Sequence, residues 1–179
     1  MKVSFISIIV TAGIALQVCS GCKKLTDSNG LPLATQEGRN TLGFLLNGQP
    51  WTPAGYDGGV SNLSLYYDES YRGGVFNIST YNLLHNATND IQQLTFASDS
   101  IQKPQTITFG VKNFTVIFFN DKNLCDYSST DTNTKMSGSC TITKLDKPNR
   151  IFAGTFDFVL IKAGCDTIKI TEGRFDMKY

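Results

Sequence analysis

The last third of the chain follows a two-residue repeat, the spacing that lets an extended strand separate a core from solvent. Between residues 152 and 160, phenylalanine, leucine or glycine occupies every second position, and Thr155 and Asp157 lie between them. Because side chains alternate across a β-strand, this pattern predicts one buried and one wetted face. The alternation resumes over residues 167–171, after a turn near Gly164. An antiparallel sheet with one wetted side is expected here.

The same repeat continues through the final residues of the chain. Phe175, Met177 and Tyr179 alternate with charged side chains, and Gly173 interrupts the count just before them. The chain is therefore expected to end inside a strand. Deleting the last six residues should destabilise the domain.

Shorter segments of the same kind precede this region. Residues 41–46 alternate and are followed by Asn47-Gly48, the strongest short signal for a tight hairpin turn. Further strands, each bounded by Gly, Pro, Asn or Asp, are expected at 62–67, 74–81, 91–97, 106–111 and 114–120. With no strong helical pattern, residues 39–179 are predicted to form one all-β domain of about ten short strands, mostly consecutive hairpins. An antiparallel β-sandwich and a partly closed barrel both fit.

The first 21 residues have the features of an export signal. Lys2 gives a positive start, and residues 5–18 are apolar. Fourteen residues are too few to cross a membrane, because a spanning helix needs about 20. Residues 1–21 are therefore predicted to be a signal peptide.

The end of this segment resembles a bacterial lipobox, in which small residues precede a cysteine that becomes acylated. Ser20 and Gly21 favour Cys22 as the lipidated residue, whereas Leu16 favours Cys19. An ordinary secretory signal is the other interpretation. The expected product is anchored by its lipid to the outer membrane, on a face that the sequence leaves open. Residues 22–38, which are polar and contain Gly and Pro, are predicted to be a flexible tether.

Four stretches carry a resemblance to a known family: FLLNGQPWTP, SGSCTITKLD, IFAGTFDF and DTIKITEGRFDMKY. Together they resemble a family of Bacteroidota lipoproteins that has no established activity. Its members combine a lipidated cysteine, a short linker, an opening hairpin with Asn-Gly and Trp, and a closing strand with Gly-Arg-Phe-Asp. The resemblance implies a location and a fold, and no catalytic residue.

Three cysteines lie in the exported domain itself, apart from the candidate lipidation sites: Cys125, Cys140 and Cys165. If residues 129–134 form a hairpin turn, Cys125 and Cys140 lie opposite each other, which suggests a cross-strand disulfide between them. The alternative is that all three are reduced, with Cys140 in the core. Their wide spacing does not match a structural zinc site.

Charge limits the possible partners. The chain has 16 basic and 15 acidic residues, and removal of the signal with Lys2 makes the two numbers equal. Nucleic-acid binding requires clustered basic residues, so no nucleic-acid partner is expected.

No catalytic constellation is recognisable, and a non-enzymatic protein without cofactor or metal is predicted. His85 is the only histidine and has no nucleophile motif near it. The Asp-containing segments 120–126 and 129–134 lack the ligand spacing of an EF-hand. A carbohydrate-active enzyme is one alternative, because it needs only two carboxylates. The candidate acids are Asp57, Asp68, Glu69 and Asp157.

Aromatic residues concentrate in the first half of the domain and suggest a ligand surface. The loop from Tyr66 to Gly74 combines tyrosines, both charges and glycines, and its candidate residues are Tyr66, Tyr67, Tyr71 and Arg72. Such tyrosines could stack against sugars or simply pack in strands. The leading hypothesis is a cell-envelope lipoprotein whose domain binds a glycan or protein partner or serves structurally. A lipocalin-like carrier of a small apolar ligand is a further alternative.

Overall fold

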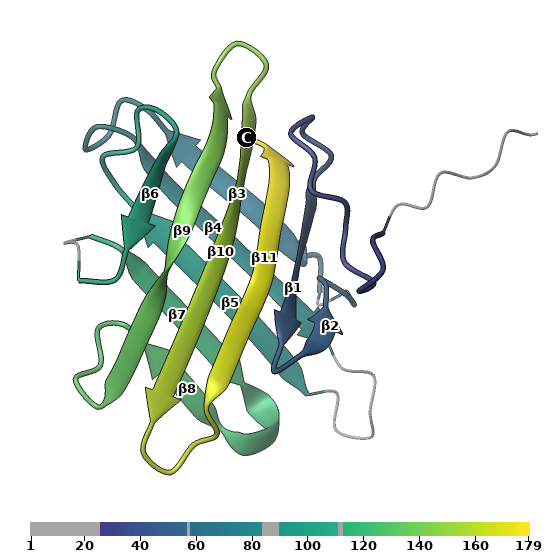
Figure 1. Ribbon diagram of the computed structural model, residues 1–179, viewed down its shortest axis with the longest axis vertical. Coiled ribbons are helices and arrows are strands. Elements are labelled where there is room, and N and C mark those ends of the chain that lie inside the picture. The colour runs from purple at the N-terminus through teal and green to yellow at the C-terminus, as the bar shows by residue number, and fades with distance from the viewer. Residues whose placement is uncertain (1–25, 57, 84–89, 111–112) are drawn as a thin grey trace, which may run out of the picture.

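Two antiparallel sheets pack face to face as a β-sandwich that is not closed into a barrel (Figure 1). The computed structural model describes residues 26–56, 58–83, 90–110 and 113–179. The predicted signal peptide, which includes Cys19, lies outside the described residues, as do Cys22, Asp57 and His85. The predicted all-β fold is confirmed, and of its two forms the structure is the sandwich. The described residues contain no α-helix.

The first sheet has six strands and contains both the first and the last strand of the fold. Its order is β2-β1-β11-β10-β9-β6, so the N-terminal strand pairs with the C-terminal one. The bounds are β1 Thr41–Leu46, β2 Gln49–Trp51, β6 Gln105–Thr108, β9 Thr134–Asp146, β10 Ile151–Lys162 and β11 Ile168–Lys178. The hairpin predicted at Asn47-Gly48 joins β1 to β2.

The second sheet has five strands in the order β3-β4-β5-β7-β8. The bounds are β3 Leu63–Asp68, β4 Val75–Leu83, β5 Ile91–Ser98, β7 Thr115–Asn120 and β8 Cys125–Ser128. A single 3₁₀ turn, Asp121–Asn123, leads from β7 into β8. Every pairing in this sheet is antiparallel.

The segment between β8 and β9 crosses from one sheet to the other. β8 pairs with β7, whereas β9 pairs with β10 and β6. The hairpin turn predicted for residues 129–134 is therefore wrong. Local turn residues cannot distinguish a hairpin from a sheet-to-sheet crossing, because both reverse the chain with the same Ser, Asp and Asn residues.

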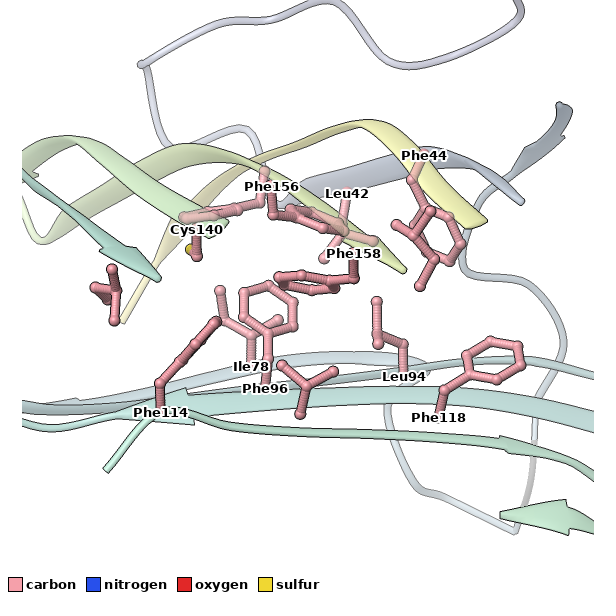
Figure 2. Close-up of a cluster of buried hydrophobic side chains, with 14 of the residues drawn as sticks. Leu42, Phe44, Ile78, Leu94, Phe96, Phe114, Phe118, Cys140, Phe156 and Phe158 are labelled. Carbon is pink, nitrogen blue, oxygen red and sulfur yellow. The ribbon is translucent and has the colours of Figure 1, made fainter. Parts of the chain in front are cut away.

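The core between the sheets is built from phenylalanine rings (Figure 2). Phe96 of β5 is central, with its ring centroid 4.9 Å from that of Phe156 and 5.8 Å from that of Phe158, both on β10. These three side chains are fully buried or nearly so, whereas Thr155 and Asp157, which alternate with the two phenylalanines of β10, are exposed. The two-residue repeat thus assigned the buried face of β10 correctly.

Residues 26–38, here called the N-terminal strap, pack against the six-stranded sheet. Leu31 is fully buried, and Asp27 forms an ion pair with Arg174 of β11, with the Oδ2 and Nη1 atoms 2.7 Å apart. The prediction of a flexible tether over 22–38 is therefore wrong for 26–38. The sequence of the strap shows no strand periodicity because the strap is not a strand. Its polar side chains and backbone N–H groups form hydrogen bonds with the sheet individually.

The carboxylate of Asp176 holds the end of the strap. It lies on β11, is almost completely buried, and accepts hydrogen bonds from Thr35 Oγ1 at 2.6 Å, Glu37 N at 3.0 Å and Gly38 N at 2.6 Å. Burial by itself raises the pKa of Asp176, but the hydrogen bonds to Thr35, Glu37 and Gly38 outweigh it, and the pKa is lowered. A charged acceptor thereby satisfies the backbone N–H groups of an irregular segment.

Candidate functional site

A cleft of about 470 Å³ opens where the end of β3 meets the turn between β9 and β10. We call it the tyrosine cleft. Its lining comes from both sheets and comprises Tyr66, Tyr67, Asp68, Glu69, Lys147, Arg150 and Tyr179. The volume lies in the range of small-molecule sites, about 300–1,000 Å³.

Both tyrosines of β3 line the cleft, but the two-residue repeat of the strand gives them different exposure. Tyr66 points outward and is 59% exposed, whereas Tyr67 is buried. The Tyr67 ring lies 4.9 Å from the ring of Tyr179 and 5.6 Å from that of Phe152, and its hydroxyl donates to the carbonyl of Ile101 at 2.7 Å. Tyr67 is therefore a fixed part of the lining, and Tyr66 is its exposed aromatic residue.

The two cations of the cleft come from the β9–β10 turn, and each has a different partner. Lys147 Nζ lies 2.7 Å from Glu69 Oε2 and also donates to Gln102 Oε1 at 3.2 Å. The guanidinium carbon of Arg150 lies 5.5 Å from the centre of the Tyr179 ring. The hydrogen bond to Glu69 raises the pKa of Lys147, which remains charged at neutral pH.

Asp68 is an ionised hydrogen-bond acceptor at the rim of the cleft. Its Oδ1 accepts from the Ser70 hydroxyl at 2.7 Å and the Ser70 N–H at 2.8 Å, and Oδ2 accepts from the Tyr66 hydroxyl at 3.3 Å. Hydrogen bonding to Ser70 lowers the pKa of Asp68, and the Asp68 charge raises the pKa of Tyr66. Tyr66 consequently keeps its proton and remains a donor.

Of the carboxylates proposed for a glycosidase, Asp68 and Glu69 line the tyrosine cleft. Such an enzyme needs a general acid whose pKa is raised, whereas that of Asp68 is lowered. Glu69 is held by Lys147, and Asp157 lies on β10, where its side chain accepts the N–H of Glu172 at 3.1 Å. Asp57 lies outside the described residues.

The predicted ligand surface is divided by the structure. Tyr66 and Tyr67 line the tyrosine cleft, but Tyr71 and Arg72 line a separate hollow of about 250 Å³ together with Asp99 and other residues. There the Arg72 guanidinium carbon lies 5.4 Å from the centre of the Tyr71 ring. Tyr71 follows Tyr67 by only four positions, and the loop between them is enough to place the two side chains over different surfaces.

Sequence reasoning missed the other half of the tyrosine cleft. Lys147, Arg150 and Tyr179 follow Tyr67 by 80 residues or more, and only the packing of the two sheets brings them together. The signal available in the sequence was the short polar segment 146–150 between two clear strands. Such a segment indicates a hairpin turn, but it does not indicate which loop of the other sheet lies beside it.

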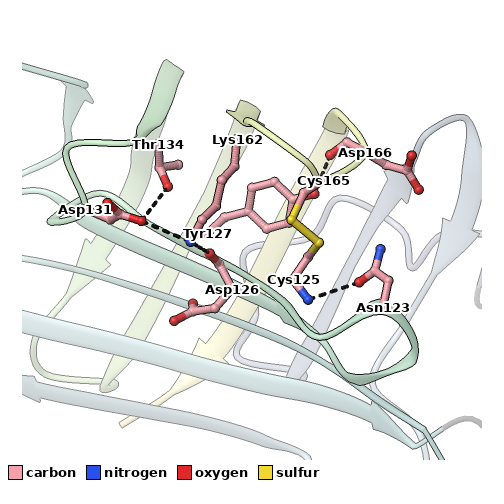
Figure 3. Close-up of a disulfide and its surroundings, with 9 residues drawn as sticks. All are labelled: Asn123, Cys125, Asp126, Tyr127, Asp131, Thr134, Lys162, Cys165 and Asp166. Atoms are coloured by element: carbon pink, nitrogen blue, oxygen red, sulfur yellow. Dashed lines mark hydrogen bonds and ion pairs between the residues drawn. A yellow bond between two sulfur atoms is a disulfide. The ribbon is translucent and has the colours of Figure 1, made fainter.

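The disulfide joins Cys125 to Cys165 and not to Cys140 (Figure 3). Cys125 begins β8 in the five-stranded sheet, and Cys165 lies in the β10–β11 turn of the other. Next to the bond, the Tyr127 hydroxyl donates to the carbonyl of Asp166. Cys140 is a free thiol, completely buried in the core. The predicted Cys125–Cys140 pair depended on the hairpin that does not form.

Other features bear on membrane and metal chemistry. Within the described part of the chain, no helix is long and apolar enough to span a membrane. The same residues contain no group of three or more His, Cys, Asp or Glu side chains placed to hold a metal ion. Asp131 belongs to one of the two Asp-containing segments that were compared with an EF-hand. It forms an ion pair with Lys162, with the Oδ2 and Nζ atoms 3.0 Å apart.

The lipocalin-like alternative required a closed barrel with an interior cavity. The sheets do not close, and the rings of Phe96, Phe156 and Phe158 fill the space between them. The tyrosine cleft, at the surface, is therefore the better candidate. Comparison of the chain with family models, with curated proteins and with solved structures finds no match.

Proposed function

We propose that this protein is a lipid-anchored, non-enzymatic lipoprotein of the bacterial cell envelope and that it binds a glycan in the tyrosine cleft. The observation that carries the binding proposal is the exposed ring of Tyr66 beside a fixed set of polar groups, Asp68, Lys147 and Arg150. Sugar rings have apolar faces and hydroxyl edges. An aromatic face next to hydrogen-bonding groups matches both.

The rigidity of the cleft supports the same function. Tyr67 and Tyr179 are in edge contact, and Lys147 and Glu69 are paired across the two sheets. A site whose side chains are already ordered loses less conformational entropy when a ligand binds.

The proposed location depends on the sequence. The apolar segment 5–18 followed by Cys22 has the features of a lipoprotein signal, and the resemblance to Bacteroidota lipoproteins agrees with this interpretation. Two or three acyl chains hold a protein stably at a membrane, because each buried methylene contributes about 0.8 kcal/mol. The strap, which packs on the sheet, begins at residue 26. The proposed anchor, Cys22, therefore precedes the folded domain by only a few positions in the sequence.

A glycan array followed by titration calorimetry tests the binding proposal. The protein should be produced from residue 23 onward, because removal of residues 26–38 would expose the buried contacts of the strap. Tyr66→Ala should weaken binding about tenfold or more, since exposed tyrosines at binding sites contribute heavily. Tyr56→Ala is the matched control, because Tyr56 is 75% exposed and lies outside the cleft. Absence of binding to any glycan, or equal effects of both variants, would contradict the proposal.

A further inference from the structure

We infer that the tyrosine cleft selects sugars that carry a carboxylate and that Arg150 is the residue that recognises this group. The inference rests on the proposed function, because it specifies the ligand class of the same cleft. The charged side chains of the cleft differ in the hydrogen-bonding capacity that their existing contacts leave for a ligand.

Three of the four charged side chains are already engaged. Lys147 is paired with Glu69 at 2.7 Å, and the Asp68 carboxylate accepts hydrogen bonds from Ser70 and Tyr66. Arg150 differs from them: in the part of the chain that the structure describes, it forms no ion pair with a carboxylate. An acidic ligand would therefore find a cation that does not first have to be released from a partner.

The position of Arg150 leaves its donors accessible. The Arg150 side chain lies over the ring of Tyr179, and the neighbouring ring of Tyr67 supports Tyr179 in turn. A guanidinium held over an aromatic ring retains the N–H groups along its edge. Those groups match the two oxygens of a carboxylate in a bidentate arrangement.

The backbone of the turn fixes this position. Arg150 has a φ of 57° and its N–H donates to the carbonyl of Lys147 at 3.2 Å, while Asp146 accepts from the N–H of Asn149 at 3.1 Å. The turn is thus closed by its own hydrogen bonds. A sugar ring resting on Tyr66 could place a carboxylate toward Arg150, because both residues line the same cleft.

The first experiment compares ligands on the unchanged protein. The full chain, purified in mild detergent, is titrated with oligogalacturonate, with the same oligosaccharide after reduction of its carboxyl groups, and with a sulfated oligosaccharide that lacks carboxylates. Oligogalacturonate should bind about 10- to 100-fold more tightly than its reduced form, the range expected for hydrogen bonds between charged groups. Higher salt should reduce this difference.

The second experiment compares two arginines in similar surroundings. Arg150→Ala should remove the preference for oligogalacturonate over the reduced form, and Arg150→Lys should restore only part of it, because lysine lacks the planar pair of donors. Arg72→Ala is the matched control: Arg72 also lies over a tyrosine ring and also has a positive φ, but it lines the other hollow. It should leave the preference unchanged.

The outcomes separate this inference from the proposed function. Equal affinity for oligogalacturonate and its reduced form would overturn the inference and leave glycan binding intact. Equal binding of the sulfated oligosaccharide would overturn the choice of a carboxylate. Loss of the preference in Arg72→Ala and not in Arg150→Ala would overturn the role of Arg150. No binding to any sugar would contradict the proposed function itself. The ligand comparison decides the question even if a variant fails to fold.

Discussion

The Cys125–Cys165 disulfide connects the two sheets of the sandwich across 40 residues of sequence, with the Cα atoms 6.0 Å apart. Cys125 starts an edge strand of the five-stranded sheet, and Cys165 lies in a turn of the six-stranded one. Next to the bond, Lys162 Nζ donates to the carbonyl of Asp126 at 2.7 Å (Figure 3). β8 is a short edge strand, and the covalent link adds to the hydrogen bonds by which Asp126 and Tyr127 already join it to the opposite sheet.

Removing this bond should lower the free energy of unfolding. Replacement of Cys125 and Cys165 by Ser should cost about 4 kcal/mol, because the bond restricts a loop of about 40 residues in the unfolded chain. Urea unfolding of the double variant measures the loss. Peptide mapping without reductant should recover a Cys125–Cys165 peptide, and recovery of a Cys125–Cys140 peptide would contradict the structure.

Cys140 should resist thiol reagents while the protein is folded. Its side chain is completely buried, and burial raises the pKa of the thiol, so the reactive thiolate does not form near neutral pH. Iodoacetamide at pH 8, followed by peptide mapping, should modify Cys140 only after denaturation. Modification of the native protein at the rate of an exposed cysteine would show that this part of the core opens.

Asp176→Asn should destabilise the protein in a pH-dependent way. The pKa of Asp176 is lowered in the folded protein, so its contribution is complete above the unfolded value of about 4 and disappears as the pH falls through the lower folded value. At pH 7 we expect a loss of about 2–3 kcal/mol, and a much smaller difference near pH 2. Urea unfolding at several pH values measures this effect.

The same variant should also loosen the strap. Hydrogen exchange at the amides of Glu37 and Gly38 should become faster, because both donate to the Asp176 carboxylate. Asp126→Asn, which alters an exposed side chain on β8, is the control and should leave exchange in the strap unchanged. Parallel stability curves for Asp176→Asn and the unchanged protein down to pH 2 would contradict the assigned role.

Deletion of residues 174–179 should prevent cooperative folding. β11 lies between β1 and β10, and the deletion removes the buried side chains of Phe175 and Met177. Losing either side chain costs about 2–5 kcal/mol, and total stability is typically about 5–15 kcal/mol. Thermal unfolding followed by circular dichroism provides the test. Lys169→Ala, at an exposed position of the same strand, should unfold normally, and an unchanged melting temperature for the deletion would refute the prediction.

Cys22→Ser should abolish fatty-acid labelling and release the protein from membranes. The reason is chemical: acylation of a lipoprotein requires the thiol of the lipobox cysteine. Metabolic labelling with a fatty acid and membrane fractionation provide the measurement. Persistent labelling of this variant, combined with its loss in Cys19→Ser, would identify Cys19 as the anchor. Normal labelling of both variants would contradict the lipoprotein interpretation.

Whether a structural feature of this protein can be predicted from its sequence depends on how far apart in the chain the contacting residues lie. The strands β10 and β11, the residues that they turn toward the core and the Asn47-Gly48 hairpin were predicted correctly, because alternation and turn chemistry act between near neighbours in the chain. The wetted side expected for the last strand is wrong at Asp176, which the strap covers. The disulfide partner and the strap were predicted wrongly. In both cases the decisive contact joins residues that are 40 or more positions apart, such as Cys125 and Cys165 or Gly38 and Asp176.

The candidate site shows the same division. The sequence by itself determined that Tyr66 and Tyr67 belong to a strand edge near a charged loop, since residue types and alternation are local properties. Only the tertiary structure decided that Lys147, Arg150 and Tyr179 complete a cleft with them, while Tyr71 and Arg72 face a different hollow. The physical reason is that sheet-on-sheet packing depends on how all the buried phenylalanine rings fit together, and no single segment encodes that fit.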